Sequence, residues 1–571
     1  MTLIDDNSAR VGQGMKLHEL LKAAGIKRPL KSKNIEITSI VADSRLAGPG
    51  TVFVAVPGQK VDGHKFVADA IAKGCDAVVV MKGAKITVAG HVQRIVEDDC
   101  REALAKMAAA FNGFPQKNMK MIGITGTNGK TTTTYLLESV IKASGGNPGV
   151  IGTVNYRYLG HEIAAPFTTP EPAELFSLLR KMLDAGVTHV IMEVSSHALS
   201  QKRLYGLVFD VALFTNLSRE HLDFHHDMEE YFKVKKSLFT NHLKKEGISV
   251  VVEDESFDRS GVEGWGRRLA KELMSPLKNQ GSGTTESSLV TCGIEDGLVH
   301  VDRYQYDLQG VEAEVVYLGD RLHLRSSLVG KFNLKNVLGV TGVAFALGIK
   351  GTDIERGIVN LSKVPGRLER VMVGEGSDET AGTKFFVDYA HTPDALENVL
   401  STLRKLTAGR IVVVFGCGGD RDKGKRPEMG EIAGRIADVV LITSDNPRSE
   451  VPERIMAEIE RGICAGLSVG KAGNEMMRAG MRMRAEILLR RGWRGYDLIV
   501  SRREAISLAV RYAKPEDVVL ISGKGHENYQ ITKSGRRFFD DRLELLNQTN
   551  LIGWKSTFKR YEYGAGKEFC I

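Results

Sequence analysis

Apolar and polar positions alternate along the chain in short blocks that predict strands followed by helices. Within residues 1–117, the runs "TVFVAVPG" and "DAVVVM" predict buried strands. The stretch "HKFVADAIAKG" has the apolar spacing of a helix, and "REALAKMAAAFNGFP" predicts another helix that ends at Pro115. Residues 1–117 are therefore predicted to form a small α/β domain.

Residues 118–361 repeat this alternation on a larger scale. Four apolar runs, "MIGIT", "HVIMEV", "VALFTN" and "ISVVV", predict strands, and helical or polar sequence follows each of them. This order favours a mostly parallel sheet covered by helices. The composition of "LKNQGSGTTESSLV" predicts a loop at 277–290, and the three alternating runs after it, up to residue 330, predict antiparallel strands.

Residues 362–571 form the third predicted domain. Its expected strands are "KFFVDYA", "RIVVVFG", "DVVLITSD" and "DVVLISGKG". A Met- and Arg-rich helical stretch, residues 474–492, lies between the last two. We interpret it as a solvent-exposed helix rather than a binding device, because arginine on an exposed face needs no further explanation.

Composition narrows the class of protein. A chain of 571 residues is too long for one core and fits about three domains. No apolar run is long enough to cross a bilayer and the N-terminus lacks the pattern of a secretory signal, so we expect a cytoplasmic protein without a membrane partner. The six cysteines are scattered, which predicts reduced thiols. The formal charge of +8 suits anionic small molecules, and no Lys- and Arg-rich stripe indicates nucleic acid.

One segment, "MIGITGTNGKTTTTYLL" (residues 121–137), predicts a strand, a glycine-rich turn and a helix start. Such a turn directs backbone N–H groups and the positive end of a helix dipole at an anion. Lys130 is placed to reach phosphate oxygens, and the Thr131 hydroxyl is a ligand for Mg²⁺. The alternative is a glycine-rich turn with an unrelated lysine. The spacing departs from an ordinary P-loop, because Ile124 occupies the position of the first glycine.

Other polar residues have ordinary interpretations when taken alone. Glu193 ends a predicted strand and is a candidate second ligand for Mg²⁺. His221 and Lys235, from spacing alone, are more simply surface or core residues. Asn333 and Asn336 are candidate helix caps.

Arg448, in "TSDNPRSE", is more simply part of a turn. That loop, "FGCGGDRDKGKRPEM" and "LISGKGHENYQ" nevertheless all follow strands of one domain, so we expect them to meet at one sheet edge.

"GITGTNGKTTT" resembles the variant ATP loop of the Mur ligases and folylpolyglutamate synthetases, which accounts for the unusual glycine spacing. The resemblance to Mur ligases spans roughly residues 35–545. It implies an α/β fold of three domains, with a central P-loop-type ATPase domain of mostly parallel sheet and a Rossmann-like C-terminal domain. It also implies ATP contacts in both of these domains: Gly126, Thr127, Asn128, Gly129, Lys130, Thr131, Thr132, Asn333, Asn336, Arg367, Asp388 (with its neighbour Tyr389) and His391.

The same resemblance implies a functional role for His221 and Lys235. "NLSREHLDFH" and "EEYFKVKKSLF" resemble the family segment in which a histidine and a carbamylated lysine support a second metal ion. An ammonium is repelled by Mg²⁺, whereas its CO₂ adduct is a carboxylate-like ligand. The implied catalytic residues are Lys130, Glu193, His221 and Lys235, and the implied Mg²⁺ ligands are Thr131, Glu193, His221 and carbamylated Lys235.

The N-terminal segment narrows the choice within the family. "VADSRLAGPGTVFVAVPGQKVDGHKFVADAIAKGCDAVVV" resembles the uridine-nucleotide domain of members that extend the muramyl peptide, which folylpolyglutamate synthetases lack. Hydroxyl and guanidinium groups suit this anionic substrate. The implied contacts to the UDP-sugar-peptide are Ser44, Thr168, Thr169, Ser195, Gln201 and Arg203.

The three loops of the last domain resemble the amino-acid pocket of the members that use meso-2,6-diaminopimelate. There, the arginine of D-N-P-R binds the distal carboxylate. A bidentate guanidinium suits that carboxylate and not the bare ammonium of L-lysine. Glu527 is an acceptor for the distal ammonium. The implied diaminopimelate contacts are Arg421, Asp445, Asn446, Pro447, Arg448, Gly523 and Glu527.

The resemblance thus implies a ligase that uses ATP and Mg²⁺ to add meso-diaminopimelate to UDP-N-acetylmuramoyl-L-alanyl-D-glutamate through an acyl phosphate. The expected protein is a cytoplasmic monomer of peptidoglycan synthesis. Two alternatives remain at this stage, the same ligation with L-lysine or another diamino acid, and a non-catalytic scaffold. Ser501 and Val252 depart from the family pattern, and the predicted helical insertion at 465–493 and the tail after about 545 lie outside it.

Overall fold

A computed structural model describes residues 14–30, 32–58, 61–88, 90–220, 224–253, 263–279, 289–372, 382–469 and 482–551. Its contacts divide the chain into two units. The first contains Met1–Tyr304, Glu312–Arg325 and Phe332–Leu361, and the second contains Gln305–Val311, Ser326–Lys331 and Ser362–Ile571. The three sequence-based domains, 1–117, 118–361 and 362–571, stay a prediction.

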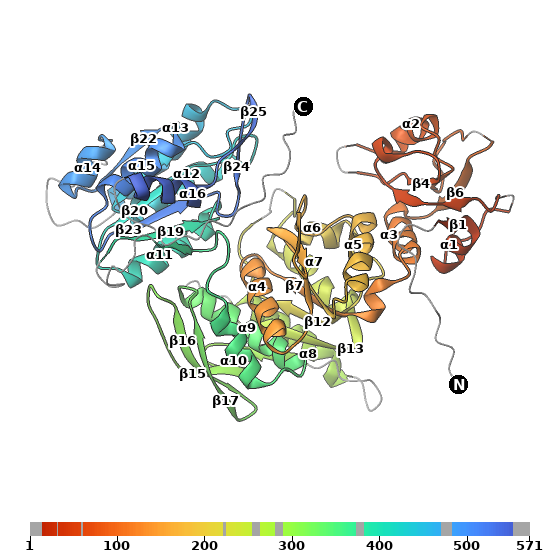
Figure 1. The fold of residues 1–571 in the computed structure, drawn as a ribbon, viewed down its shortest axis with the longest axis horizontal. Helices are drawn as coiled ribbons and strands as arrows, with labels where there is room; N and C mark the ends of the chain where they lie inside the picture. The colour runs from red at the N-terminus through yellow and green to blue at the C-terminus, as the bar shows by residue number, and fades with distance from the viewer. Residues whose placement is uncertain are drawn as a thin grey trace. The chain divides into compact units, whose positions relative to one another are not determined.

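The N-terminal part of the first unit contains a four-stranded parallel sheet in the order β3-β4-β5-β6 (red to orange in Figure 1). Val52, Val78 and Val79 are fully buried, as the apolar runs predict. The strands and helices of this part are β1 Met15–Lys16, α1 Leu17–Ala23, β2 Glu36–Ile37, β3 Ser39–Val41, η1 Ser44–Leu46, β4 Thr51–Val54, η2 Gly63–Phe66, α2 Val67–Ala72, β5 Ala77–Met81, β6 Gln93–Glu97, α3 Cys100–Phe111 and η3 Pro115–Asn118.

An eleven-stranded sheet follows, in the order β10-β9-β8-β11-β7-β12-β13-β14-β15-β16-β17. The neighbouring strands of this sheet from β8 to β14 pair in parallel, which matches the predicted parallel sheet. The strands are β7 Lys120–Thr125, β8 Pro148–Ile151, β9 Asn155–Tyr158, β10 His161–Ala164, β11 His189–Glu193, β12 Phe209–Phe214, β13 Leu243–Val252, β14 Leu289–Cys292, β15 Val299–Tyr306, β16 Val311–Tyr317 and β17 Asp320–Ser326.

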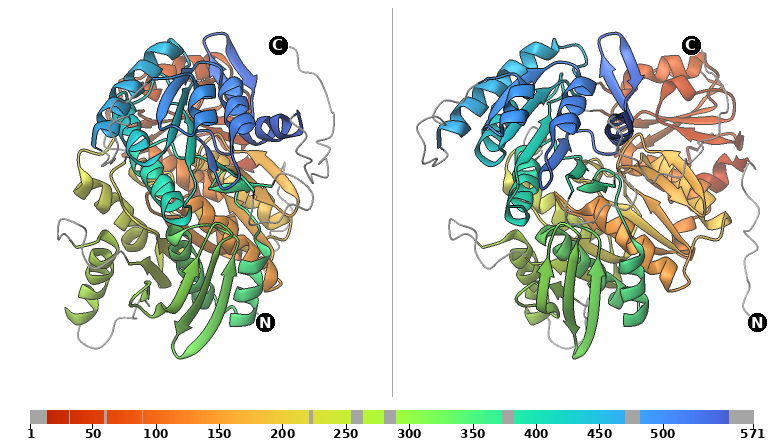
Figure 2. Two further views of the ribbon diagram at one scale, coloured as in Figure 1. Left: turned by 90° about the vertical axis from the view of Figure 1, so that its left-hand side faces the viewer. Right: turned by 60° about the vertical axis from the view of Figure 1, so that its left-hand side comes forward.

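Helices flank this sheet, and the long strands β15, β16 and β17 run side by side at its end (green in Figures 1 and 2). The loop predicted at 277–290 was wrong at both ends, because α8 continues to Asn279 and β14 begins at Leu289. Its residues 280–288 lie outside the described part. The helices are α4 Lys130–Ala143, α5 Pro172–Asp184, α6 Ser196–Ser200, α7 Met228–Asn241, α8 Trp265–Asn279, α9 Lys331–Ala346 and α10 Gly351–Asn360.

The second unit is built on a six-stranded sheet in the order β18-β19-β23-β20-β21-β22. All its pairs are parallel except β18 with β19. The elements are β18 Glu369–Val371, β19 Lys384–Asp388, α11 Pro393–Leu406, β20 Ile411–Phe415, α12 Lys425–Ile436, β21 Val439–Thr443, α13 Pro452–Val469, α14 Ala485–Arg491, β22 Gly495–Ile499, α15 Arg502–Tyr512, β23 Val518–Ser522, β24 Tyr529–Thr532, β25 Gly535–Phe538 and α16 Asp541–Leu551.

The predicted Met- and Arg-rich helix, residues 474–492, is described only from residue 482. Only α14 lies in its described part, and residues 474–481 lie outside that part. Leu488 and Leu489 of α14 are buried in the core while Arg490 is exposed. The tail after 545 begins as the second half of α16, whose Leu545 and Leu546 pack into the same core. No helix among the described residues is long and apolar enough to span a bilayer.

A buried ion pair fastens α15 and α16 to the end of β23. Arg502 and Asp541 are both fully buried, and the Arg502 guanidinium donates from Nε and Nη2 to the two Asp541 oxygens at 2.7 and 2.6 Å. Nη2 also donates to the Ser522 carbonyl at 2.9 Å. The carboxylate of Asp541 raises the pKa of Arg502 against the opposing effect of burial. The arrangement holds the residue that precedes the 523–528 loop.

We expect Asp541→Asn to lower the free energy of unfolding by about 3 kcal/mol, because it leaves the buried Arg502 without its counter-charge. Chemical denaturation followed by circular dichroism measures the change. The matched control is Glu397→Gln, which breaks the exposed pair with Arg435 and should shift stability by less than about 1 kcal/mol. Equal effects of the two substitutions on the free energy of unfolding would show that burial of the Arg502 pair does not increase its contribution to stability.

Candidate active site

The turn between β7 and α4 has a shape that only glycine permits at two positions. Gly126 and Gly129 have φ angles of +149° and +87°. A Cβ on Gly126 would overlap Thr215 Oγ1, and one on Gly129 would overlap Asn336 Oδ1. Ile124, at the place of the missing glycine, is fully buried inside β7. The glycine turn therefore begins directly after β7, at Gly126. The position where an ordinary P-loop has its first glycine lies inside the strand, which accounts for the unusual glycine spacing.

Lys130 begins α4, and its ammonium lies against this turn. Its Nζ donates to the carbonyls of Gly126 at 2.8 Å and Thr127 at 2.9 Å. The turn is tied to the end of the neighbouring strand β12, since Asn128 N–H donates to Asn216 Oδ1 at 2.9 Å. Thr132, the following predicted contact, is buried in the first turn of α4. A positive side chain, a fixed glycine turn and a helix N-terminus are thus together, as an anion site requires.

Glu193 ends β11, which pairs with β7, so its carboxylate reaches the same edge. Its Oε2 accepts from Thr131 Oγ1 at 3.2 Å and from Thr153 Oγ1 at 2.9 Å, and it is almost fully buried. Carboxylate and hydroxyl oxygens are the donors that Mg²⁺ prefers, so this donor set fits the ion. Within the described residues no three His, Cys, Asp or Glu side chains are grouped closely enough to hold a metal by themselves.

Lys235 lies in α7 and points at the glycine turn. Its side chain is 1% exposed, and Nζ donates to the Gly126 carbonyl at 2.9 Å. Burial, and then the charge of Lys130, hold the pKa of Lys235 well below its usual range, while Glu220 opposes this shift. Lys233 in the same helix is exposed. His221, the predicted partner of Lys235, lies outside the described residues.

Asn333 and Asn336 are not helix caps. Both lie inside α9, which begins at Lys331, and both are buried. Asn336 Nδ2 donates to Asn333 Oδ1 at 3.0 Å, and Asn336 lies directly against Gly129. The cap interpretation was wrong because the helix starts right after Gly330, whose φ is +101°. The Asn336 amide instead borders the glycine turn, and the Asn333 amide is hydrogen-bonded to it.

Most of the predicted UDP-sugar-peptide contacts form one hydrogen-bonded cluster beside Glu193. Thr169 Oγ1 donates to the Glu193 carbonyl at 2.7 Å and accepts from Ser195 N–H at 3.1 Å. Arg203 donates to the Thr169 carbonyl and to Gln201 Oε1. The structure therefore brings these four residues together.

The two remaining predicted contacts differ in placement. Thr168 joins the cluster through Thr153, with 3.1 Å between their hydroxyl oxygens. Ser44 lies in the N-terminal part, at the start of η1, where its carbonyl accepts from Lys73 Nζ at 3.0 Å.

In the second unit, aromatic and charged side chains are grouped around the end of β19. The Arg367 guanidinium lies 4.6 Å from the centre of the Tyr389 ring, and the ring centres of His391 and Tyr389 are 4.5 Å apart. Asp388 accepts from the N–H groups of Leu368 and Ala390, and burial raises the pKa of its carboxyl. The three predicted nucleotide contacts of this unit, Arg367, Asp388 and His391, are therefore neighbours.

The three expected loops do meet at one edge, because β21, β20 and β23 are adjacent in the sheet. Asn446 Nδ2 donates to Glu527 Oε2 at 2.9 Å. Arg448 Nη1 donates to the Gly419 carbonyl at 2.7 Å, which joins the D-N-P-R loop to the loop after β20. The φ angle of Arg448 is +52°, a conformation uncommon for non-glycine residues and often found at functional sites.

The other predicted members of this group border the same edge. A Cβ on Gly523 would come within 2.7 Å of Asp445 Oδ2, so the backbone passes close to that carboxylate. Pro447 lies between Asn446 and Arg448, and Arg421 is exposed on the loop after β20, near Gly418. Sequence reasoning missed two residues, Thr153 beside Glu193 and the buried Lys524 beside Glu527. The position of Thr153, just after a strand, was an available signal.

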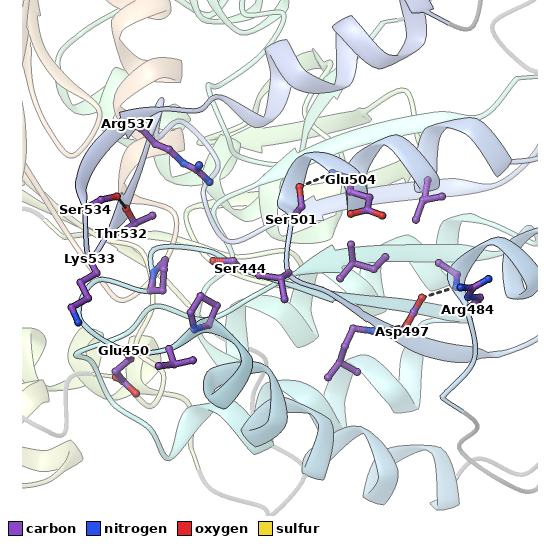
Figure 3. A pocket seen from close by; sticks show the side chains of 18 of the residues that line it. Ser444, Glu450, Arg484, Asp497, Ser501, Glu504, Thr532, Lys533, Ser534 and Arg537 are labelled. Atoms are coloured by element: carbon purple, nitrogen blue, oxygen red, sulfur yellow. Dashed lines mark hydrogen bonds between the residues drawn. The ribbon is translucent and has the colours of Figure 1, made fainter.

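A cavity of about 1260 Å³ lies beside the D-N-P-R loop, between that loop, the ends of β22 and α14, and the β24–β25 hairpin (Figure 3). Ser444 and Pro447 line it, but Asn446, Arg448 and Glu527 do not. Several of its charged side chains already have protein partners. Glu450 pairs with Arg426, and Arg537 donates to Gln530. Of the predicted amino-acid contacts, Pro447 is the one that lines this cavity among the described residues.

Family comparisons match most of the chain. A model of the Mur ligase family catalytic domain matches residues 36–112, the Mur ligase middle domain matches 124–344, and the Mur ligase glutamate ligase domain matches 366–525. A protein of Geobacter metallireducens named "UDP-N-acetylmuramoyl-L-alanyl-D-glutamate--2,6-diaminopimelate ligase" is 40% identical over 535 residues, which cover 93% of this chain and 98% of that protein. The chain belongs to the Mur ligase family.

Further relatives support this assignment for the Mur ligase described here. A ligase of the same name from Solibacter usitatus is 38% identical over 546 residues, with 95% of this chain and all of that protein covered. A solved structure of a ligase of that name is 29% identical, with a TM-score of 0.62 over 94% of this chain and 99% of the other. A MurF ligase of Thermotoga maritima in complex with ADP, 19% identical with a TM-score of 0.55, covers 90% of this chain and 98% of its own and shows the shared fold.

The two departures of this Mur ligase from the family pattern have structural roles. Ser501 caps α15, where its hydroxyl accepts from the Glu504 N–H at 3.3 Å. Val252 is buried at the end of β13 and packs near Gly339 of α9. A short polar residue caps a helix as aspartate does. Neither residue lies among the predicted metal or amino-acid contacts.

Proposed function

We propose that this Mur ligase joins meso-2,6-diaminopimelate to UDP-N-acetylmuramoyl-L-alanyl-D-glutamate, with ATP as the energy source. The family assignment and the names of its relatives support the ligase and its substrates. The observation that carries the choice of acceptor is the meeting of Asn446, Arg448 and Glu527 at one sheet edge. We further propose a monomer that works in the cytoplasm as a step of peptidoglycan synthesis.

The proposed first step is transfer of the ATP γ-phosphoryl group to the side-chain carboxylate of the D-glutamate, which gives an acyl phosphate. Gly126 to Thr132 surround the phosphates, Asn333 and Asn336 contact the adenine, and Arg367, Asp388 and His391 contact the rest of the nucleotide. Lys130 stabilises the charge that develops on the phosphoryl oxygens. Thr131, Glu193, His221 and carbamylated Lys235 would hold Mg²⁺, which supplies further positive charge at the phosphates when bound.

In the second step, the amine of diaminopimelate attacks the acyl phosphate, and loss of phosphate leaves the amide. Ser44, Thr168, Thr169, Ser195, Gln201 and Arg203 hold the UDP-sugar-peptide in place. At the other end of the acceptor, Arg448 binds the distal carboxylate and Glu527 accepts from the distal ammonium, while Arg421, Asp445, Asn446, Pro447 and Gly523 complete the pocket. The contribution of the protein is mainly positioning and electrostatics.

The direct test is mass spectrometry of the nucleotide product after incubation with UDP-muramyl dipeptide, ATP, Mg²⁺ and meso-diaminopimelate. The proposal predicts a product heavier than the dipeptide nucleotide by one diaminopimelate minus one water. An unchanged nucleotide, obtained from folded protein, would contradict the proposal.

We expect Arg448→Met to lower kcat/KM for meso-diaminopimelate by about 100-fold, since it removes a charge-assisted, bidentate contact to a carboxylate. Most of the change should be in KM for the amino acid, measured from initial rates of phosphate release. The matched control is Arg454→Met, an exposed arginine at the start of α13, which should retain the wild-type rate. An unchanged KM in Arg448→Met would exclude the proposed contact.

A further inference from the structure

A fully buried lysine lies beneath the predicted acceptor residues. Lys524 follows β23 in the "SGKGHEN" loop, and its side chain has no exposed surface. Gly523 and Gly525 on either side have φ angles of +113° and +53°, so the backbone turns sharply at this residue. Burial of a lysine ammonium is costly unless the charge is paired, which makes its partners informative.

Those partners are two of the predicted diaminopimelate contacts. Lys524 Nζ lies 3.1 Å from Glu527 Oε2 and donates to Asn446 Oδ1 at 3.4 Å. Asn446 Oδ1 also accepts from the Ile531 N–H at 2.9 Å, while its Nδ2 donates to the same Glu527 oxygen. This pattern defines which end of the Asn446 amide faces Glu527. Lys524 and Asn446 together hold the Glu527 carboxylate at one oxygen.

The lysine also changes the charge balance of the pocket. Asp445 and Glu527 are the predicted anionic contacts, and Arg448 is the cation proposed to bind the distal carboxylate. Arg421 is the other predicted cationic contact, and Lys524 adds a third positive charge, so the cations exceed the anions by one. The nearby Arg502 is paired with Asp541 and adds no net charge. An excess of positive charge favours the distal end of diaminopimelate, which carries a carboxylate as well as an ammonium, over the bare ammonium of L-lysine.

We propose that Lys524 is a positioning and specificity-determining residue. It holds Glu527 and Asn446 in place and, by cancelling one negative charge, disfavours acceptors that end in a bare ammonium. This inference rests on the proposed function, and it adds a residue that acts on the amino acid through its neighbours.

The test measures kcat and KM of Lys524→Met with meso-diaminopimelate and with L-lysine. We expect KM for meso-diaminopimelate to rise about tenfold, as for the loss of one charged hydrogen bond. The ratio of kcat/KM between the two acceptors should shift toward L-lysine, and KM for ATP should not change. Lys524→Gln, which keeps a polar side chain without the charge, should shift the ratio in the same direction and serves as the second variant if the methionine protein does not fold.

Lys405→Met is the matched control, because Lys405 is exposed in the last turn of α11. It should leave both acceptors unaffected. An equal loss with both acceptors, or an unchanged ratio in folded Lys524→Gln, would overturn the inference and reduce Lys524 to a structural role. Turnover of the wild-type enzyme with meso-diaminopimelate, measured in the same assay, tests the proposed function separately.

Discussion

Lys130→Met should lower kcat for phosphate release by about 10³-fold, the largest effect expected from any single substitution. The ammonium lies on the glycine turn, 2.8 Å from the Gly126 carbonyl, where the phosphates are proposed to bind. Methionine keeps the length of the side chain and removes the charge that stabilises the transferring phosphoryl group. The measurement is phosphate release at saturating concentrations of all substrates.

The control for this substitution is Lys142→Met, in the last turn of the same helix α4. Lys142 pairs with Glu138 at the surface and should be replaceable without loss of activity. If Lys130→Met instead kept a rate close to that of the wild type, the turn after β7 would not be the phosphate site.

The second large effect is expected at Lys235. Replacement by methionine should lower kcat by about 100-fold, because it removes the carbamate proposed to act as a charged ligand at the phosphates. The lowered pKa of Lys235 favours this modification, since only a neutral amine attacks CO₂. The neutral form is available above the lowered pKa and is lost as the pH falls through it. The adduct should therefore persist at neutral pH and disappear on acidification.

Carbon-13 NMR of protein equilibrated with labelled bicarbonate detects the adduct directly. Wild-type protein should give one carbamate resonance that is missing in Lys235→Met. Lys233→Met is the matched control, because Lys233 lies in the same helix with its side chain in solvent, and it should keep both the resonance and the rate. A fully active Lys235→Met enzyme would refute the assigned role.

The sequence predicted the fold class and the edge where the acceptor loops meet, because these depend on local pattern. Continuous apolar runs identify strands buried on both faces, and parallel strands place their following loops at one edge. β22 escaped prediction because Gly495 and Asp497 interrupt its apolar run. It is also the edge strand of its sheet, where burial on both faces is not required.

The contacts within the site depended on long-range packing and were less predictable. Nothing in "SGKGHEN" indicates that Lys524 turns inward, since lysine is rarely fully buried. The pattern predicts Asn333 and Asn336 at a helix start, whereas the contact of Asn336 with Gly129, about 200 positions earlier, follows only from the packing of α9. At Ile124, where an ordinary P-loop has its first glycine, the structure has the buried end of β7.

The most direct test of the central claim is phosphate release from ATP by the purified protein with UDP-muramyl dipeptide. Meso-diaminopimelate, L-lysine and no amino acid are offered in parallel. The account predicts release that depends on meso-diaminopimelate. Release with L-lysine alone would contradict the assignment of Arg448 and Glu527, and no release with any acceptor from folded protein would contradict the ligase itself.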